Sequence, residues 1–347
     1  MRYSRGLAIL VGTFIVASAP WAYAVTTLFV ANNGVDSSAC GSQINPCRSI
    51  TQGIANASPG DKIIVGPGTY GDLDGDGILG ETGEETSTGC VGCMLGIHKP
   101  VTLTSSDGAA ATIIDARTAF YSHNVRITAD GVVFGAPGQG FTVTSTAAND
   151  LDIAFGNGVV IDSDGVNVQG NQIVHFETEA SRSPAGYGIY AFGLAQIEGN
   201  QVSGWGTGIA GNPNTTIKQN AVQSNEYGIQ TFGSTVTGNI VIGNRNSGIS
   251  LYDDSSVVGN TILGNTSTGI FIFDSGVTGT IESNNIFGNG CGMNASTGGV
   301  LATNNYWGAA TGPGADPADD VCGSGGATAT TTPFATKAFS VKVSIKP

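Results

Sequence analysis

The stretch VTGNIVIGNRNSGISLYDDSSVVGNTILGNTSTGI, residues 236–270, contains the same pattern twice. In each copy Gly-Asn is followed five residues later by another Asn and then by Gly-Ile. The Gly-Ile pair recurs along the chain, beginning at residues 188, 208, 228, 248 and 269. A sequence that returns to one phase about every 20 residues indicates stacked repeats that share a continuous core.

Two sets of asparagines recur with this spacing. The first set is Asn171, Asn200, Asn220, Asn239, Asn260 and Asn284, and the second is Asn225, Asn244, Asn265 and Asn289. An Asn tolerates the left-handed backbone conformation of a turn, and its amide both donates and accepts hydrogen bonds. A ligand site needs its residue once, whereas these residues recur. We therefore predict that the first set is a structural ladder, with Gly turning each corner and Ile filling the core.

Each repeat contains short runs in which apolar residues alternate, as at Ile240 and Ile242, separated by turn residues. The chain has 54 glycines and only 11% charged residues, which excludes a helical bundle. Three short strands joined by tight turns make one coil of a parallel β-solenoid. The sequence thus predicts an all-β fold in which successive coils pair along one axis.

The N-terminus has the features of a secretory signal peptide. Arg2 and Arg5 precede an apolar run over residues 7–19, and Ala22-Tyr23-Ala24 provides small residues for cleavage. No later stretch has the roughly 20 apolar residues of a membrane-spanning helix. We expect a protein without a transmembrane segment in the mature chain, secreted or otherwise extracytoplasmic: extracellular, periplasmic or at the cell surface. The net charge of −13 argues against nucleic acid, anionic membranes and, unless a cation bridges, polyuronates.

Six cysteines fall into three groups that are local in sequence. In an exported chain we expect disulfides, and we favour the local pairs Cys40 with Cys47, Cys90 with Cys93, and Cys291 with Cys322. Cys90-Val-Gly-Cys93 also matches the spacing of a redox or metal-binding pair. However, no helical pattern follows it and no second such pair accompanies it, which favours a structural disulfide.

Two further blocks carry a family resemblance. NPCRSITQGIANASPGDKIIVGPGTY, residues 45–70, places Ile50, Ile54 and Ala57 on one face of a short helix before the first coil. GGVLATNNYWGAATGPG, residues 298–314, contains an Asn-x-Trp-Gly element. With the repeats, these blocks resemble right-handed parallel β-helix proteins of the pectate-lyase-like superfamily, particularly secreted NosD-like members. The resemblance implies a single-stranded right-handed parallel β-helix with a capping helix at its N-terminal end, but no particular activity.

The expected organisation follows from these features. Residues 1–24 are a signal peptide, 25–70 the N-terminal cap and first coil, and 71–96 an acidic loop insertion. Residues 97–310 form the β-helix coils, and 311–347 a C-terminal cap or tail.

The acidic insertion contains the sharpest local motif, GDLDGDGILGETGEE at residues 71–85. Asp72, Asp74 and Asp76 alternate as in the opening of a calcium-binding loop, and Gly77 allows a sharp turn. The twelfth position of such a loop is Gly83 here instead of Glu. Other carboxylates would then have to complete the coordination shell of the ion. The predicted ligands of a structural calcium ion are Asp72, Asp74, Asp76, Glu81 and Glu84. The alternative is a solvated acidic loop.

Aromatic residues recur three residues after Gly-Ile. If alternation continues outward from the buried Ile, they form an exposed ribbon on which sugar rings can stack, whereas an intervening turn would bury them. The predicted substrate-binding residues are Phe192, Phe232, Tyr252 and Phe273, with the adjoining Asp253 and Asp274.

Candidate catalytic groups are weaker. The insertion HFETEASRSPAGY, residues 175–187, predicts a loop over one face, and a carboxylate pair lies one coil earlier. Together they offer the acid and base that glycan cleavage requires, or simply a solvated polar loop. The candidates are Asp162, Asp164, His175, Glu177 and Arg182.

The catalytic patterns of the resembling superfamily are absent from the sequence. Two Asp-Asp pairs lack their usual partners, and the three histidines do not cluster. Two hypotheses follow. The chain is an exported β-helix that binds a polysaccharide or cell-surface glycan on a lateral face and, if it is an enzyme, processes it as a lyase or glycoside hydrolase. Alternatively, it is a non-catalytic adhesin-like or scaffold protein.

Overall fold

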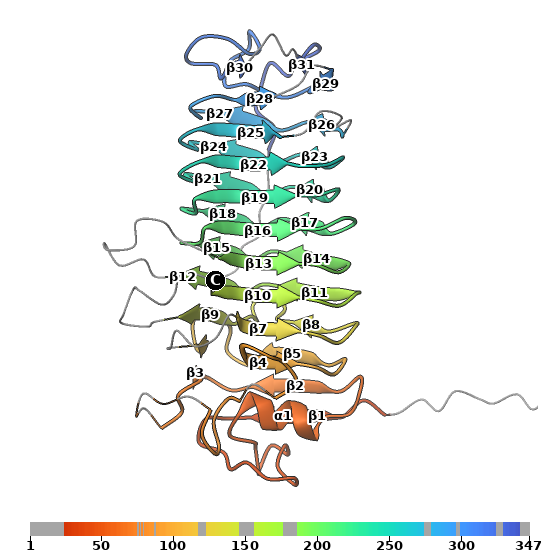
Figure 1. Ribbon diagram of the computed structural model, residues 1–347, viewed down its shortest axis with the longest axis vertical. Coiled ribbons are helices and arrows are strands. Elements are labelled where there is room, and N and C mark those ends of the chain that lie inside the picture. Colours follow the sequence, from red (N-terminus) through yellow and green to blue (C-terminus); the bar gives the residue numbers. More distant parts are fainter. Residues whose placement is uncertain are drawn as a thin grey trace, which may run out of the picture.

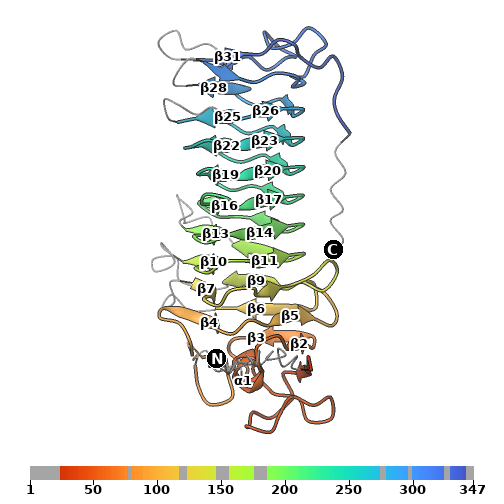
Figure 2. The ribbon, with the colours of Figure 1, turned by 90° about the vertical axis from the view of Figure 1, so that its right-hand side faces the viewer.

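The computed structural model forms one column of stacked coils with a short helix at the N-terminal end (Figures 1 and 2). It describes residues 24–74, 76, 78, 80–86, 88–116, 123–145, 156–175, 186–273, 279–295, 299–323 and 329–340. The described residues contain almost only β-structure, and every pair of named strands is parallel. The predicted fold, a parallel β-helix, is therefore confirmed.

Each full coil contributes one strand to each of three sheets, which we call sheets 1, 2 and 3. Sheet 1 contains β1 (Thr27–Val30), β2 (Lys62–Val65), β5 (Thr102–Ser105), β8 (Val133–Phe134), β11 (Val166–Gln169), β14 (Ala195–Glu198), β17 (Thr216–Lys218), β20 (Thr235–Thr237), β23 (Ser256–Val258) and β26 (Ile281–Glu282). Sheet 2 contains β3 (Gly68–Tyr70), β6 (Thr112–Asp115), β9 (Thr142–Ser145), β12 (Gln172–His175), β15 (Gln201–Ser203), β18 (Ala221–Gln223), β21 (Ile240–Ile242), β24 (Thr261–Leu263) and β27 (Asn285–Phe287).

Sheet 3 holds the longest strands of the coils and positions the candidate site described below. It contains β4 (Cys93–Ile97), β7 (His123–Ile127), β10 (Asn157–Ile161), β13 (Tyr187–Ala191), β16 (Thr207–Gly211), β19 (Tyr227–Thr231), β22 (Ser247–Leu251), β25 (Thr268–Ile272), β28 (Met293–Ala295) and β30 (Val321–Cys322). A separate small sheet pairs β29 (Val300–Leu301) with β31 (Ala329–Thr330).

The core lies inside the column, where equivalent residues of successive coils stack. Ile189, Ile209, Ile229, Ile249 and Ile270 are register partners in sheet 3, and all are fully buried. Each buried aliphatic side chain of this kind stabilises the fold by about 1.5–3 kcal/mol relative to an exposed one. Because the register places like on like, one coil packs on the next without cavities between unlike shapes.

The first asparagine set lies at the corner between sheets 1 and 2 and is buried throughout. Oδ1 of Asn239 accepts from the backbone N–H of Asn220 at 2.9 Å and from its Nδ2 at 3.0 Å. The same two bonds link every neighbouring pair from Asn171 to Asn284, and Asn305 extends the column by one coil. The ladder thus satisfies corner backbone groups that are sealed from water.

Two details of the expected repeat are wrong. The left-handed residue is the one before each ladder Asn, for example Gly238 at φ +63° and Gln219 at φ +55°. The Gly of Gly-Ile does not turn a corner but lies inside a strand of sheet 3. A Cβ on Gly228 would lie 2.9 Å from Nδ2 of Asn244, and one on Gly248 would lie 2.7 Å from Nδ2 of Asn265. This Gly therefore makes room for the second asparagine set.

Helix α1 (Ile50–Asn56) closes the N-terminal end, with Ile50, Ile54 and the following Ala57 buried, as predicted. The buried Glu85 carboxylate accepts from the backbone N–H groups of Ile50 and Thr51 at 2.6 and 2.8 Å. Burial raises the pKa of Glu85 to about 7, against the lowering effect of these donors. The acidic insertion thereby caps the helix that covers the first coil.

Three disulfides join the cysteines in the pairs favoured by their spacing. They are Cys40–Cys47, Cys90–Cys93 and Cys291–Cys322, with Cα–Cα distances of 4.9, 6.0 and 6.2 Å. The first fastens the N-terminal cap, and the third ties β30 of the last coil to the chain near β28. Cys90–Cys93 closes a four-residue loop before β4, so the structure places a disulfide where a metal-binding pair was the alternative.

Candidate functional site

The outward face of sheet 3 carries a column of aromatic side chains. Phe192, Phe232, Tyr252 and Phe273 each follow a strand, and each backbone N–H donates to a carbonyl of the preceding coil at 2.8–3.0 Å. Phe192 and Phe273 are 50% and 59% exposed. The rings of Phe232 and Tyr252 lie 4.8 Å apart between centroids, and those of Tyr252 and Phe273 lie 4.9 Å apart. These residues, together with Asn212, which interrupts them, form what we call the aromatic column.

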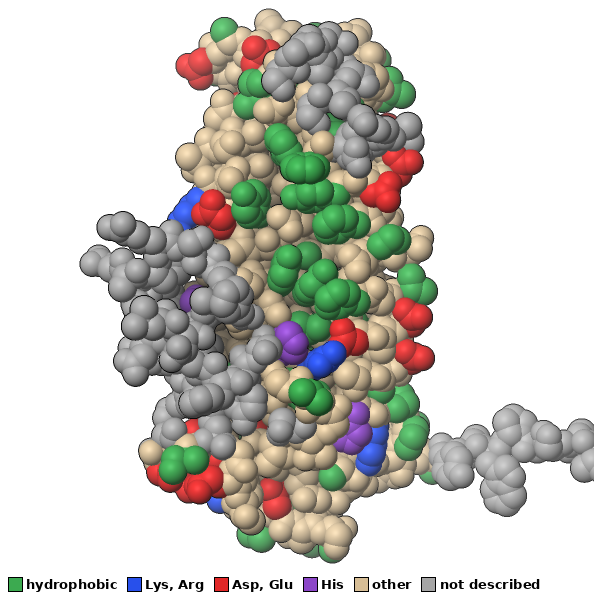
Figure 3. Space-filling view, viewed as in Figure 1, with side chains coloured by type: hydrophobic (Ala, Val, Ile, Leu, Met, Phe, Trp, Pro, Cys, Tyr) green, Lys and Arg blue, Asp and Glu red, His purple; other side chains and the backbone are tan. Residues whose placement is uncertain are grey.

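Further aromatic residues on sheet 3 widen this column into a face (Figure 3). Tyr190 lies 4.4 Å from Tyr187 and 4.0 Å from Phe192 between ring centroids. Burial raises the pKa of Tyr190 and of Tyr252, so both phenols stay neutral at physiological pH. The aromatic face comprises Tyr187, Tyr190, Phe192, Tyr227, Phe232, Tyr252, Phe271 and Phe273.

A hollow of about 280 Å³ lies at the C-terminal part of this face. Its floor contains the buried hydroxyl residues Ser247, Ser250 and Thr268. Its remaining lining residues are Tyr227, Asn246, Tyr252, Ser267, Phe271, Phe273 and Asn294. Aromatic rings beside hydroxyl and amide groups can contact the apolar faces of a sugar and bond to its hydroxyls.

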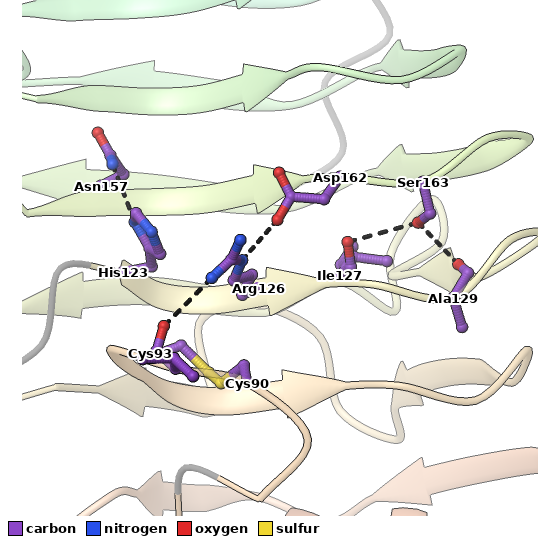
Figure 4. Close-up of polar contacts among 10 residues, drawn as sticks. Cys90, Cys93, His123, Arg126, Ile127, Ala129, Asn157, Asp162 and Ser163 are labelled. Atoms are coloured by element: carbon purple, nitrogen blue, oxygen red, sulfur yellow. Dashed lines mark hydrogen bonds and ion pairs between the residues drawn. A yellow bond between two sulfur atoms is a disulfide. The ribbon is translucent and has the colours of Figure 1, made fainter.

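Toward the N-terminal end, sheet 3 carries a group of polar side chains that contact one another (Figure 4). Nε of Arg126 donates to Oδ2 of Asp162 in an ion pair, and Nη1 of Arg126 donates to the Val91 carbonyl at 3.2 Å. Nδ1 of His123 lies 2.9 Å from Nδ2 of Asn157. We call His123, Arg126, Asn157 and Asp162 the polar end of the face.

Sequence reasoning missed much of this site. Tyr187 and Tyr190 flank the Gly-Ile pair that was identified as core, and their outward alternation was the available signal. His123, Arg126 and Asn157 lie on coils where the 20-residue period does not hold, since 34 residues separate His123 from Asn157. Without that period, nothing in the sequence indicates that these side chains are neighbours.

Of the catalytic candidates that the structure describes, Asp162 and His175 lie apart. Asp162 follows β10 at one edge of sheet 3, whereas His175 ends β12 of sheet 2, near the opposite edge. The five residues of a sheet 3 strand separate those edges by roughly 16 Å. Asp164 lies in the turn toward sheet 1, where Oδ1 accepts from the backbone N–H of Leu194 at 2.8 Å.

Other expected site residues lie off the aromatic face or outside the described part. Asp253 is exposed at the corner after Tyr252 and does not line the hollow. Glu177, Arg182 and Asp274 fall outside the described residues, as does the expected signal peptide up to residue 23.

The carboxylates of the acidic insertion converge in two groups. Ligand oxygens of Asp72, Asp74 and Glu84 lie within 4.8 Å of one another, and so do those of Asp74, Asp76 and Glu81. Repulsion, chiefly from Asp76, raises the pKa of Glu81. Oxygen ligands spaced in this way suit a hard cation such as Ca²⁺.

Comparisons with known proteins agree with the architecture. The family model described as right handed beta helix region matches residues 157–306. None of the curated proteins matches the chain in sequence. Among the described residues, no helix has the length and apolar character needed to cross a membrane.

Three solved structures illustrate the likeness. Pectate lyase Pel9A is 16% identical, with 90% of this chain and 78% of that one covered and a TM-score of 0.51. The Dettilon tailspike protein is 14% identical, with 81% of this chain but only 54% of that one covered and a TM-score of 0.47. An alginate lyase from Paenibacillus sp. str. FPU-7 is 13% identical, with 89% and 99% covered and a TM-score of 0.44. At such identities the likeness concerns fold alone. With its parallel sheets and the match over residues 157–306, this chain has the fold of a right-handed parallel β-helix.

Proposed function

We propose that this protein binds a polysaccharide or cell-surface glycan along the outward face of sheet 3. The observation that carries the proposal is the aromatic column beside a hydroxyl-lined hollow. Exposed and half-buried aromatic side chains spread over several coils present an elongated apolar surface, and such surface patches mark ligand-binding sites. Hydroxyl and amide groups between the rings match the alternating apolar and hydroxyl edges of sugars.

The charge of the chain favours a neutral glycan. The net charge of −13 repels polyanions, and the hollow has no charged lining residue. We place the binding outside the cytoplasm, because three disulfides suit an oxidising compartment. The likeness to a pectate lyase concerns the fold, so the proposal rests on the side chains of this face and includes no cleavage step.

A binding screen tests the proposal. The full chain is titrated against neutral glucan, xylan, mannan and galactan and against pectate and alginate, with and without calcium, while new reducing or unsaturated ends are followed. We expect saturable binding of at least one neutral polysaccharide. Tyr252→Ala should weaken that binding, whereas Phe339→Ala, a partly exposed aromatic residue away from sheet 3, should not. Absence of binding to the whole panel would overturn the proposal in favour of a scaffold.

We also propose that the acidic insertion holds a structural calcium ion. Asp74 belongs to both carboxylate groups, and Oε1 of the buried Glu84 is fixed by the backbone N–H of Leu73 at 2.7 Å. A cation there would relieve repulsion among these carboxylates and order the loop that caps α1. It would add about 2.7 kcal/mol of stability at a calcium concentration 100 times the Kd.

Thermal unfolding in calcium and in chelator tests the calcium proposal. We expect a higher melting temperature with calcium, an increase that Asp74→Asn abolishes and Asp130→Asn retains. Equal melting temperatures of the unsubstituted chain in calcium and chelator would contradict it.

A further inference from the structure

The outward-facing residues of sheet 3 that are aromatic on β13 have no aromatic register partner on β10. Asn157 pairs in register with His123, Val160 with Arg126 and with Tyr190, and Asp162 lies one coil below Phe192. In the first column, Tyr187 is followed toward the N-terminal end by Asn157 and then His123. In the second column, Tyr190 is followed by Val160 and then Arg126. In the third column, Phe192 is followed by Asp162. A ligand stacked on the aromatic face and extended along the column axis therefore reaches the polar end directly.

Arg126 and Asp162 present a donor and an acceptor side by side. The bonds between them use Nε of the guanidinium and Oδ2 of the carboxylate, and Nη1 is bound by the Val91 carbonyl. The two side chains are 31% and 22% exposed, so both can meet a ligand. Held at both ends, the guanidinium loses little further rotamer freedom when a ligand binds. As an ion pair, the two groups carry no net charge.

His123 lies in the same polar end, and its ring orientation is fixed by its neighbour Asn157. Oδ1 of Asn157 accepts from the backbone N–H of Tyr187 at 2.8 Å. The other amide atom of Asn157, Nδ2, must then donate to Nδ1 of His123, 2.9 Å away. In the neutral ring, the proton consequently resides on Nε2, which points away from Asn157.

The disulfide loop marks where the face ends. Cys93 is the register partner of His123 on the next coil toward the N-terminus, and it closes the loop with Cys90. Val91, in that loop, is 86% exposed, and its carbonyl oxygen accepts from Nη1 of Arg126. A chain lying on the aromatic column and continuing in this direction meets a projecting, covalently closed loop.

We propose that the polar end is a clamp for the terminal sugar of a neutral polysaccharide. Each sugar hydroxyl both donates and accepts, so two neighbouring hydroxyls fit an adjacent guanidinium and carboxylate. The loop with Val91 stops the chain beyond this sugar. This inference rests on the proposed glycan binding and adds to it the recognition of a free chain end.

Hexasaccharides of glucose, xylose, mannose and galactose test the clamp. Each is used in three forms: unmodified, reduced to the alditol at one end, and methylated on the terminal hydroxyls of the other end. We expect at least one unmodified probe to bind, and modification of one particular end to weaken binding about tenfold, the loss of roughly one charged hydrogen bond.

Variants separate the clamp from the aromatic face. Asp162→Asn and Arg126→Gln should weaken binding of the unmodified probe about tenfold and abolish the preference for the free end. Tyr252→Ala should weaken all forms of the probe alike, and Asp130→Asn, a surface carboxylate outside the polar end, should change none. Unchanged melting temperatures show that the variants fold.

Two outcomes overturn the clamp. If the polysaccharides bind but the unsubstituted chain treats free and modified ends alike, the clamp is wrong while the proposed function stands. The clamp is also wrong if Asp162→Asn and Arg126→Gln keep the end preference. If neither polysaccharides nor hexasaccharides bind, the proposed function itself fails.

Discussion

The interior corners and the outward face of sheet 3 are built from the same coils but follow opposite rules. At the corner between sheets 1 and 2, each coil supplies an Asn that makes the same bonds as the Asn before it. On the outward face, one coil supplies Tyr190, the next Ala210 and the next Gln230, although these residues are register partners. Repetition serves the stacking of the coils, and departures from it mark surfaces on which side chains are not constrained by stacking.

The difference has a physical cause. A corner amide is sealed from water, so each coil must satisfy the same backbone groups by the same side chain. An outward side chain need not make the bonds of a sealed corner and needs only to avoid its neighbours, so substitutions at solvent-exposed positions change stability little. A patterned aromatic face at such free positions therefore calls for an explanation other than folding.

Among the tests of this difference, we expect the largest effect from a substitution in the buried asparagine ladder. Asn239→Ala removes the acceptor of two donors on Asn220 and leaves the Ile217 carbonyl without its bond from Nδ2 of Asn239. Each buried polar group left unsatisfied costs about 1–3 kcal/mol. We expect a loss of about 3–5 kcal/mol in the free energy of unfolding, measured by urea denaturation.

Gln230→Ala on the outward face is the matched control for this loss. It should change the unfolding free energy by no more than about 0.5 kcal/mol. Equal losses of unfolding free energy for the two variants would contradict the proposed difference between the interior corner and the outward face.

The second prediction concerns affinity at the aromatic face. The ring of Tyr252 contacts both Phe232 and Phe273, so it forms the centre of the aromatic column. Tyr252→Ala should weaken binding of a polysaccharide identified in the screen about tenfold, or about 1.4 kcal/mol, by isothermal titration calorimetry. Its unfolding free energy should change far less than that of Asn239→Ala. A stability loss as large as that of the ladder variant, with affinity retained, would make this face structural.

The third prediction extends the aromatic column. Asn212 stands between Phe192 and Phe232 in the column and interrupts the rings. Asn212→Phe should join the two aromatic clusters and tighten polysaccharide binding several-fold, since an aromatic contact contributes about 0.5–1.5 kcal/mol. Asn212→Ala separates the gain of a ring from the loss of an amide. Weaker binding by the Phe variant than by the Ala variant would show that the interruption is itself part of the site.

The fold could be predicted because its rules repeat. The phase of the asparagines, the Gly-Ile pairs and the locally paired cysteines each give several copies of one signal. What failed was the conformational detail. A Cβ on Gly228 would lie 2.3 Å from the Gly248 carbonyl oxygen, 2.7 Å from Val241 and 2.9 Å from Asn244, all in the next coil. Such a requirement is visible only once the coils are stacked.

The site could be predicted from the sequence only where its residues recur with the same spacing as the coils. The aromatic column follows Gly-Ile by a fixed step and was therefore expected, and its exposure at Phe192 and Phe273 follows from alternation. The polar end joins Arg126 to Asp162 across 36 residues, a separation without a repeat. In the same way, grouping Asp162 with His175 by sequence overlooked the length of the sheet 3 strand that separates them.

The smallest expected effect concerns the tyrosines of the face at high pH. Burial, and then the neighbouring Tyr227 and Tyr187, raise the pKa of Tyr252 above its ordinary value of 10.0. Folding thus favours the neutral phenol, so this stabilisation is fully present below pH 10 and is lost as the pH rises through the higher folded pKa. In a titration followed by tyrosinate absorbance, Tyr252→Phe should remove a late-titrating component while leaving the interior ladder and its stability below pH 10 unchanged. If the component removed titrates at or below pH 10, Tyr252 is as solvated as in an unfolded chain, and the packing of the aromatic column is looser than its ring distances indicate.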